Sequence, residues 1–345
     1  MQAGDRIVAS TAIYEGTRGL LLENLPRLGI EVDFVEEVGD PAAWERAIRP
    51  ETRVLFGESI ANPRNELFDI AAVAGIAHRH GIPLVVDSTF ATPYLLRPIE
   101  HGADVVVHSA SKFLAGHGAV LGGVIVDNGA FDAERSGALF PHLVEPDRLG
   151  GAGFAERVGG RARIAYLRDV VAMRFGPTPS PLNAFLINQG IETLSLRVER
   201  HSRNALAVAS WLQGRPEVHA VDYAGLASHP SHALARRYLS GGFGSVFSFT
   251  LEGGLPAARA FVDALEVFTH MTHLGDVRSL VLHPATTSHN LRTPEEQREA
   301  GILPGTLRVS IGIEDEADLI ADLERGLAAA RAVAARSASS RGSAA

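Results

Sequence analysis

Short apolar runs separated by amphipathic stretches fill the first half of the chain. Runs bounded by turn residues are typical of strands that a parallel sheet buries on both faces. The stretches between them carry apolar residues at helical spacing and predict helices at 16–28, 41–48 and 69–80. The predicted strands are 6–10, 31–36, 53–59, 82–87, 103–108 and 121–126. Strands and helices alternating at this spacing predict βαβ units and an α/β fold with a mostly parallel, doubly wound sheet.

The second half follows a different pattern. Residues 129–180 are rich in Gly, Arg and Pro, and Gly-Pro-Thr-Pro-Ser-Pro at 176–181 indicates a boundary. Beyond it we expect helices at 191–213, 257–267 and 315–334, and strands at 218–223, 245–251, 280–283 and 306–311. We therefore predict a large domain over 1–182, a smaller α+β domain over 183–334, and a low-complexity, disordered tail over 335–345.

Composition narrows the possible classes of function. The 345 residues carry a net charge of -8, which provides no basic surface for nucleic acid. No run of 18 apolar residues predicts a membrane span, and the first residues lack the apolar core of a signal peptide. The chain has no cysteine, which excludes disulfides, thiolate metal sites and cysteine nucleophiles. Freedom from cysteine fits a reducing compartment, so we expect a cytoplasmic protein.

Lys112 stands out because it is the only lysine. Lysine and arginine together number 32, and every one except Lys112 is arginine. Arginine stays protonated in proteins, whereas a lysine amine can lose its proton and attack a carbonyl. One alternative is that this lysine persists by chance in a salt bridge. The other is that position 112 requires an amine.

The neighbourhood of Lys112 favours a requirement for the amine. Asp87 ends one predicted strand, and Ser109 and Ser111 follow another just before Lys112. Ligands of open α/β sheets bind outside the carboxyl ends of the strands, so these side chains should share one edge. An amine, an acid and two hydroxyls suit pyridoxal 5'-phosphate (PLP), which needs a lysine and an acidic partner for its ring nitrogen. Taken separately, Asp87 could be a helix cap and the serines a turn.

Several segments resemble one enzyme family. The segments are 58–63 (Glu-Ser-Ile-Ala-Asn-Pro), 86–94 (which contains Asp-Ser-Thr-Phe), 97–104, 109–112 (Ser-Ala-Ser-Lys), 275–285 and 307–314. Together they resemble the trans-sulfuration (Cys/Met metabolism) branch of fold-type I PLP-dependent enzymes, over nearly the whole chain. Within that branch, Ile60 and the His-Pro-Ala-Thr-Thr-Ser-His stretch at 283–289 are most similar to the O-acetylhomoserine sulfhydrylases. The resemblance implies an aspartate aminotransferase-like fold.

The resemblance also assigns cofactor-binding roles. Lys112 would bind PLP as a Schiff base and shuttle protons, and Asp87 would pair with the pyridinium nitrogen. Tyr14 would stack on the cofactor ring, although the sequence alone favours a core aromatic at the end of a strand. Ser109 and Ser111 would donate their hydroxyls to the phosphate.

Substrate-binding roles follow from the same resemblance. Arg308 would bind the substrate carboxylate with its two-pronged guanidinium, helped by Ser279 and Asn62. Arg308 is one arginine among many, and only its place in the matching motif distinguishes it.

The reaction implied is a γ-replacement. O-acetyl-L-homoserine and sulfide would give L-homocysteine and acetate, a step of methionine biosynthesis, in a homo-oligomer such as a dimer or tetramer. Cystathionine γ-synthase and γ-lyase activities of the same family are alternatives. No metal site is expected, since the histidine pairs His78 with His80 and His283 with His289 lack suitable spacing or carboxylates.

The chain also departs from the family pattern. Members carry a further N-terminal segment, before the equivalent of Gly4, that helps to hold the phosphate and reaches a neighbouring subunit. That segment is not found in this sequence, so an N-terminally truncated, catalytically impaired paralogue is a further alternative. Ser88 and Ser111 stand where Asn and Thr are commoner.

Overall fold

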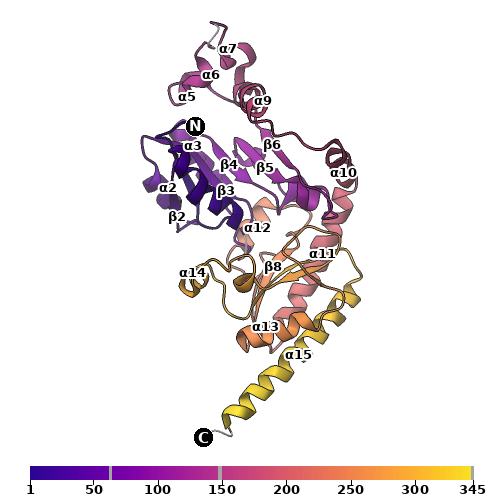
Figure 1. The fold of residues 1–345 in the computed structure, drawn as a ribbon. Coiled ribbons are helices and arrows are strands. Elements are labelled where there is room, and N and C mark those ends of the chain that lie inside the picture. Colours follow the sequence, from indigo (N-terminus) through magenta and orange to yellow (C-terminus); the bar gives the residue numbers. More distant parts are fainter. Residues whose placement is uncertain (62–63, 147–149, 343–345) are drawn as a thin grey trace.

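The computed structural model describes residues 1–61, 64–146 and 150–342, and its strands form two sheets (Figure 1). The larger sheet has six strands in the order β2-β1-β3-β4-β5-β6. The first five are parallel, and β6 pairs antiparallel with β5. The predicted mostly parallel α/β sheet is therefore confirmed. Its strands are β1 (Arg6–Ser10), β2 (Glu31–Val35), β3 (Thr52–Glu58), β4 (Leu84–Asp87), β5 (Val105–Ser109) and β6 (Gly123–Asp127).

Four helices connect the strands of this sheet. Asp69 caps α3, because its side chain accepts a hydrogen bond from Ala72 N at 3.3 Å. The helix predicted over 16–28 is regular only at its start and continues as a wide turn and a 3-10 turn, since Pro26 cannot donate a backbone hydrogen bond. The helices are α1 (Glu15–Gly19), α2 (Pro41–Ala47), α3 (Ile70–Arg79) and α4 (Thr92–Leu95).

Between β6 and the second half of the chain lies a group of short helices at the top of Figure 1. They share a small apolar cluster of their own around Phe131, Leu143 and Ala162. The Gly- and Pro-rich composition of this segment explains why none of them is long. They are α5 (Ala133–Ser136), α6 (Pro141–Val144), α7 (Phe154–Val158), α8 (Ala162–Tyr166) and α9 (Met173–Phe175).

The smaller sheet has five strands in the order β7-β8-β11-β10-β9, antiparallel except for β9 with β10. Apolar faces of α11, α13 and α15 contribute to its core. The predicted boundary after residue 182 falls inside α10, and the division into domains stays a prediction. The strands are β7 (Val218–Asp222), β8 (Val246–Leu251), β9 (Thr269–His270), β10 (Leu280–Leu282) and β11 (Thr306–Ser310). The helices are α10 (Pro181–Glu192), α11 (Leu194–Gln213), α12 (His232–Tyr238), α13 (Gly254–Asp263), α14 (Pro294–Glu299) and α15 (Glu316–Gly342).

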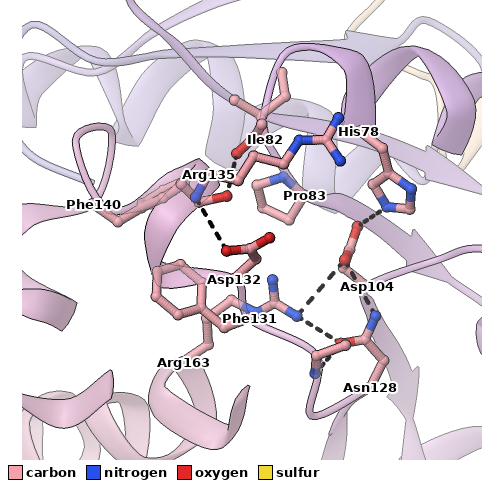
Figure 2. A pocket seen from close by; sticks show the side chains of 13 residues that line it. His78, Ile82, Pro83, Asp104, Asn128, Phe131, Asp132, Arg135, Phe140 and Arg163 are labelled. Atoms are coloured by element: carbon pink, nitrogen blue, oxygen red, sulfur yellow. Dashed lines mark hydrogen bonds and ion pairs between the residues drawn. The ribbon is translucent and has the colours of Figure 1, made fainter. Parts of the chain in front are cut away.

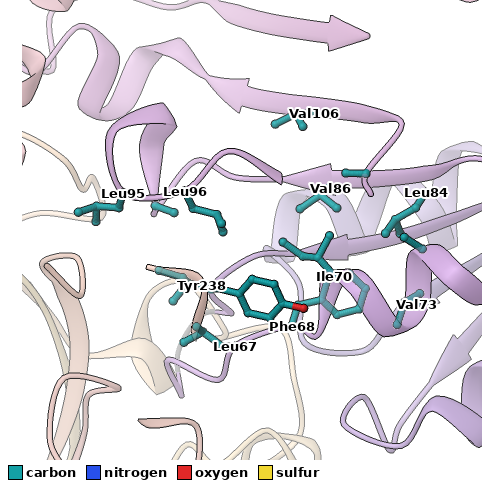
Figure 3. Packing of buried hydrophobic residues seen from close by; sticks show 14 of the residues in the cluster. Leu67, Phe68, Ile70, Val73, Leu84, Val86, Leu95, Leu96, Val106 and Tyr238 are labelled. Atoms are coloured by element: carbon teal, nitrogen blue, oxygen red, sulfur yellow. The ribbon is translucent and has the colours of Figure 1, made fainter. Parts of the chain in front are cut away.

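The main hydrophobic core lies between α3 and the larger sheet (Figure 3). Ile70 and Val73 of α3 pack toward Leu84 and Val86 of β4, and Tyr238 of α12 reaches the same cluster. Burial of each large apolar side chain contributes about 1.5–3 kcal/mol. The core therefore holds β4, which carries Asp87, rigidly in place.

Asn65 connects the two halves of the molecule. It is buried, and it has a left-handed backbone (φ 59°) that asparagine tolerates better than most residues. Its Nδ2 donates to Val246 O at 2.7 Å, and its Oδ1 accepts from Ala224 N at 2.9 Å. Both partners belong to the second half of the chain, so this side chain helps to fix how the halves meet.

Helix α15 extends past the predicted end at residue 334 and reaches Gly342. Helix thus covers 335–342 of the predicted disordered tail, where the chain contains no Gly or Pro before Gly342, and 343–345 lie outside the described residues. None of the helices in the described part of the chain is long and apolar enough to cross a membrane.

Candidate active site at the carboxyl edge of the larger sheet

The neighbouring strands β3, β4 and β5 of the larger sheet end in polar side chains at one edge. Glu58 ends β3, Asp87 ends β4 and Ser109 ends β5. The strands are parallel, and the registers Glu58 with Asp87 and Asp87 with Val107 place these ends side by side. The arrangement follows the rule used on the sequence, that ligands of open α/β sheets meet the carboxyl ends of strands.

Lys112 lies in a wide helical turn, Ala110–Leu114, immediately after β5. Its own backbone is not helical (φ -94°, ψ -127°), so the turn opens at the lysine. The side chain is half-buried, and its Nζ lies 3.0 Å from His273 Nδ1. Burial, helped by the nearby Arg308 cation, lowers the pKa of Lys112. The amine is therefore easier to deprotonate than an ordinary lysine.

Arg197 holds the backbone that follows Lys112. Its buried guanidinium donates to Phe113 O at 2.8 Å and to Gly190 O at 2.6 Å. No carboxylate among the described residues lies within 4.0 Å of it, and burial lowers its pKa. The last turns of α10 and the start of α11 are thus fastened to the lysine turn through one cation.

Asp87 is held by Thr89. Its Oδ1 accepts hydrogen bonds from Thr89 N at 2.9 Å and from Thr89 Oγ1 at 2.6 Å. Burial raises the pKa of Asp87, while the Thr89 hydrogen bonds and the nearby His108 oppose that rise. Its second oxygen has no hydrogen-bond partner among the described residues, so it is available to a ligand.

Glu58 is a second carboxyl at this edge, and sequence reasoning assigned it no role. Its Oε1 accepts from Tyr14 N at 2.6 Å. Burial, followed by the neighbouring Asp87 carboxylate, raises the pKa of Glu58 well above its ordinary value. Its place at the end of a strand, the same signal that identified Asp87, could have revealed it.

The two serines differ in their surroundings. Ser109 N donates to Thr89 Oγ1 at 2.9 Å, and the Ser109 hydroxyl has no partner among the described residues. Ser111 is buried, and its hydroxyl accepts from Gly122 N at 3.0 Å and lies 3.3 Å from Gly122 O. Only Ser109 thus keeps a free hydroxyl at the edge.

Arg308 is a buried cation on β11 of the smaller sheet. It is 5% exposed, and its Nη2 donates to the carbonyls of Thr272 and His273 at 3.2 and 3.1 Å. Burial lowers the pKa of Arg308 to about 10, and Tyr14 is near enough to oppose that change electrostatically. Within the described ranges no carboxylate pairs with it, so an anionic ligand could.

The remaining predicted residues are placed differently. Ser279 is fully buried, donates its hydroxyl to Glu314 Oε2 at 2.9 Å and accepts from Gly312 N at 2.8 Å. Asn62 lies outside the described residues. The structure thus brings Lys112, Arg308 and Tyr14 to one place, and it leaves the Ser279 hydroxyl occupied. The part of the chain that the structure describes holds no group of three metal-ligating side chains.

A separate cavity of about 230 Å³ lies at the opposite edge, where β4 and β5 begin (Figure 2). Asp104 accepts there from Asn128 Nδ2 at 3.2 Å and lies 2.9 Å from His78 Nε2. Arg163 donates to Asn128 Oδ1 at 2.7 Å and to Asp127 Oδ2 at 2.8 Å. These polar groups satisfy one another, so the cavity shows no sign of a ligand site.

Comparisons with known proteins agree with the geometry of the carboxyl edge. Residues 1–328 match the family described as Cys/Met metabolism PLP-dependent enzyme. The O-acetyl-L-homoserine sulfhydrylase of Corynebacterium glutamicum is 45% identical over 339 residues, which span 95% of this chain and 76% of that protein. The homocysteine synthase of Schizosaccharomyces pombe is 43% identical, with 94% and 76% covered.

A solved structure shows the same fold. It is that of a Campylobacter jejuni protein assigned as O-acetylhomoserine (thiol)-lyase, which carries N'-pyridoxyl-lysine-5'-monophosphate. It superposes with a TM-score of 0.87 at 36% identity, over 94% of this chain and 77% of that one.

Proposed function

The chain belongs to the Cys/Met metabolism PLP-dependent enzymes, and we propose that it converts O-acetyl-L-homoserine and sulfide to L-homocysteine and acetate. The observation that carries the proposal is the only lysine, half-buried with a lowered pKa. It lies at the sheet edge that also presents Asp87 and near the unpaired cation Arg308. The names of the relatives support this choice of substrate.

The residues present fit PLP. Lys112 supplies the amine for covalent attachment, the free oxygen of Asp87 suits the ring nitrogen, and the free hydroxyl of Ser109 suits the phosphate. Tyr14, 57% exposed at the start of α1, can cover the ring. When bound, PLP withdraws electrons from the substrate and so makes its Cα and Cβ protons easier to remove. Ser111, whose hydroxyl is already bonded to Gly122, contributes mainly by shaping the turn.

Arg308 orients the amino-acid substrate. Its buried guanidinium is held by two backbone carbonyls and can donate to the substrate carboxylate in a charge-assisted pair. Binding there places the amino group toward the sheet edge. Asn62 and Ser279 are proposed helpers of Arg308, Ser279 through the backbone it fixes rather than through its bonded hydroxyl.

Lys112 Nζ moves the protons. The amine, with its lowered pKa, would remove a proton from Cα and then one from Cβ, and the acetate would leave Cγ with the electrons of the C–O bond; one proton returns to each carbon after the sulfide has added. Sulfide then forms the C–S bond at the same carbon. The bonds broken and formed balance, and no oxidant or reductant is required.

We also propose that the chain works as a homo-oligomer in the cytoplasm. Large apolar side chains are exposed around β6, α9 and α10, among them Leu121 (77%), Phe175 (85%) and Phe185 (59%). Asn183 of α10 donates to Leu121 O at 3.0 Å, so part of this surface is continuous. Contiguous exposed apolar surface is typical of protein interfaces. Phe185→Glu should lower the mass measured by sedimentation, and an unchanged mass would contradict this surface.

The activity is tested with the purified chain and added PLP. We expect a visible absorbance band, fixation of the cofactor to Lys112 by borohydride, and homocysteine from O-acetylhomoserine only when sulfide is present. Lys112→Arg is the matched control, because it keeps the charge and removes the amine. Cystathionine from added cysteine would indicate the γ-synthase instead, and ketoacid without any thiol would indicate the γ-lyase. If the purified chain binds no added PLP, the proposed enzymatic activity is contradicted.

A further inference from the structure

His273 contacts the reacting nitrogen of the proposed enzyme. We propose that His273 is the proton acceptor of Lys112: it removes a proton from the free Lys112 ammonium and so supplies the neutral amine that the reaction needs. The inference rests on the proposed function for its purpose. The proton coupling itself can be tested without any turnover.

The contact joins two distant parts of the chain. Lys112 Nζ lies 3.0 Å from His273 Nδ1, across a separation of 161 residues. Among the described residues, His273 is the one hydrogen-bond partner of the Lys112 amine. His273 is itself fixed, because its carbonyl accepts from the buried Arg308 at 3.1 Å. The group that binds substrate in the proposed function thus also positions the imidazole.

The other ring nitrogen of His273 has no partner of its own among the described residues, and the Asp276 carboxylate is near enough to act on the ring electrostatically. His273 Nε2 is buried and has no hydrogen-bond partner in the described part of the chain. Gly118 borders both groups, since a Cβ at Gly118 would lie 2.7 Å from Asp276 Oδ2 and 3.6 Å from His273 Nε2. Only glycine leaves that space open, and it also suits the left-handed backbone (φ 61°). The order Lys112, His273, Asp276 is that of a nucleophile, its base and a carboxylate that stabilises the charged base.

The charges around His273 favour its neutral form when it is free. Burial lowers the pKa of His273, and the cations Lys112, Arg308 and Arg278 lower it further, while Asp276 opposes them. Asp276 is buried and keeps its charge through hydrogen bonds from Arg278, which lower its pKa. A neutral imidazole with its proton on Nε2 leaves Nδ1 open to accept from Lys112.

The transfer balances as a single proton moving between two nitrogens. The N–H bond of the Lys112 ammonium breaks, its electron pair stays on Nζ, and a new N–H bond forms at His273 Nδ1. The imidazolium is stabilised by the nearby charge of Asp276, and it later gives its proton to water or back to Lys112. The pair carries one positive charge throughout. Each time substrate displaces the lysine, His273 thus provides a place for the proton.

The single lysine makes a direct test possible. Protein labelled with 15N-lysine has one side-chain resonance, that of Lys112 Nζ, whose titration can be followed from pH 4 to 10 without PLP. We expect two coupled steps in the unsubstituted protein and one step in His273→Asn. The variant His270→Asn is the matched control, because His270 lies on β9 and is exposed. An identical Nζ titration in the unsubstituted protein and His273→Asn would overturn the proposal.

A second readout follows covalent uptake of PLP by its absorbance. Near pH 7 we expect His273→Asn to take up PLP about 10²-fold more slowly. The difference should vanish above the pKa of the amine, where no base is needed. A purely structural role would slow uptake equally at every pH, and that result would also refute the inference. His273→Gln, which can accept a hydrogen bond but not a proton, repeats the test should the Asn variant fold poorly.

The two proposals can fail separately. If the unsubstituted protein forms no homocysteine but shows the two-step Nζ titration, the proposed function is rejected and the proton coupling stands. The reverse outcome, normal turnover with a single-step titration, would reject the coupling alone.

Discussion

Glu58→Gln should stabilise the protein near neutral pH and have little effect in acid. Glu58 is buried, and its pKa is raised well above 4.5 by burial and by Asp87. A raised pKa means that the folded protein holds the proton after the unfolded chain has released it. The contribution of Glu58 to the free energy of unfolding is thus fully favourable below about pH 4.5. That contribution is lost as the pH rises toward the pKa of Glu58 in the folded protein. Glutamine keeps an acceptor for Tyr14 N and has no proton to lose.

The magnitude follows from the linkage between pH and unfolding. Each pH unit in which Glu58 is protonated in the folded protein and ionised in the unfolded chain costs about 1.4 kcal/mol. The advantage of Glu58→Gln should therefore grow as the pH rises above 4.5, by up to about 1.4 kcal/mol for each pH unit. It stops growing once the folded pKa of Glu58 is passed.

The assay is equilibrium urea unfolding of both proteins without PLP, at half-unit steps from pH 4.5 to 7.5. Glu51→Gln is the matched control, since Glu51 is exposed just before the same strand, and its curve should follow that of the unsubstituted protein. A stability difference for Glu58→Gln that stays constant across this range would show that Glu58 ionises freely in the folded protein. The electrostatic description of the sheet edge would then be wrong.

Three further outcomes are expected. Lys112→Arg should leave no covalently fixed PLP after borohydride, measured by mass spectrometry, and any fixed cofactor would contradict the assignment. Arg308→Gln should lower kcat/KM for O-acetylhomoserine about 10- to 150-fold, from the loss of about 1.5–3 kcal/mol in a charge-assisted hydrogen bond, with Arg236→Gln as an exposed control. Asn65→Ala should cost about 2–5 kcal/mol in urea unfolding, because two buried backbone groups lose their partners, and a cost below about 1 kcal/mol would refute its linking role.

Strand periodicity was enough to predict the larger sheet and the shared edge of Asp87 and Lys112. Both residues follow continuous apolar runs, and the rule for parallel sheets needs no other information. Arg308 could not be located in this way, because nothing in an arginine-rich sequence distinguishes a buried, carboxylate-free guanidinium from an exposed one. The resemblance to a family supplied its position.

Other parts of the site depend on contacts that a linear pattern does not contain. His273, in the connection between β9 and β10, meets Lys112 across a separation of 161 residues. Ser111 and Ser279 have the residue type expected of ligand-binding hydroxyls, yet neighbouring backbone groups and Glu314 already occupy them. Which hydroxyls stay free is decided by these local hydrogen bonds, and the sequence does not show them.

The guanidinium of Arg197 has a practical consequence for protein engineering. Because it joins the carbonyls of Phe113 and Gly190, the lysine turn, the end of α10 and the start of α11 form one rigid unit. Gly190 touches this part so closely that a Cβ would lie 2.3 Å from Ala115 O. A designer who transplants the lysine loop into another scaffold would have to carry Arg197 and Gly190 with it.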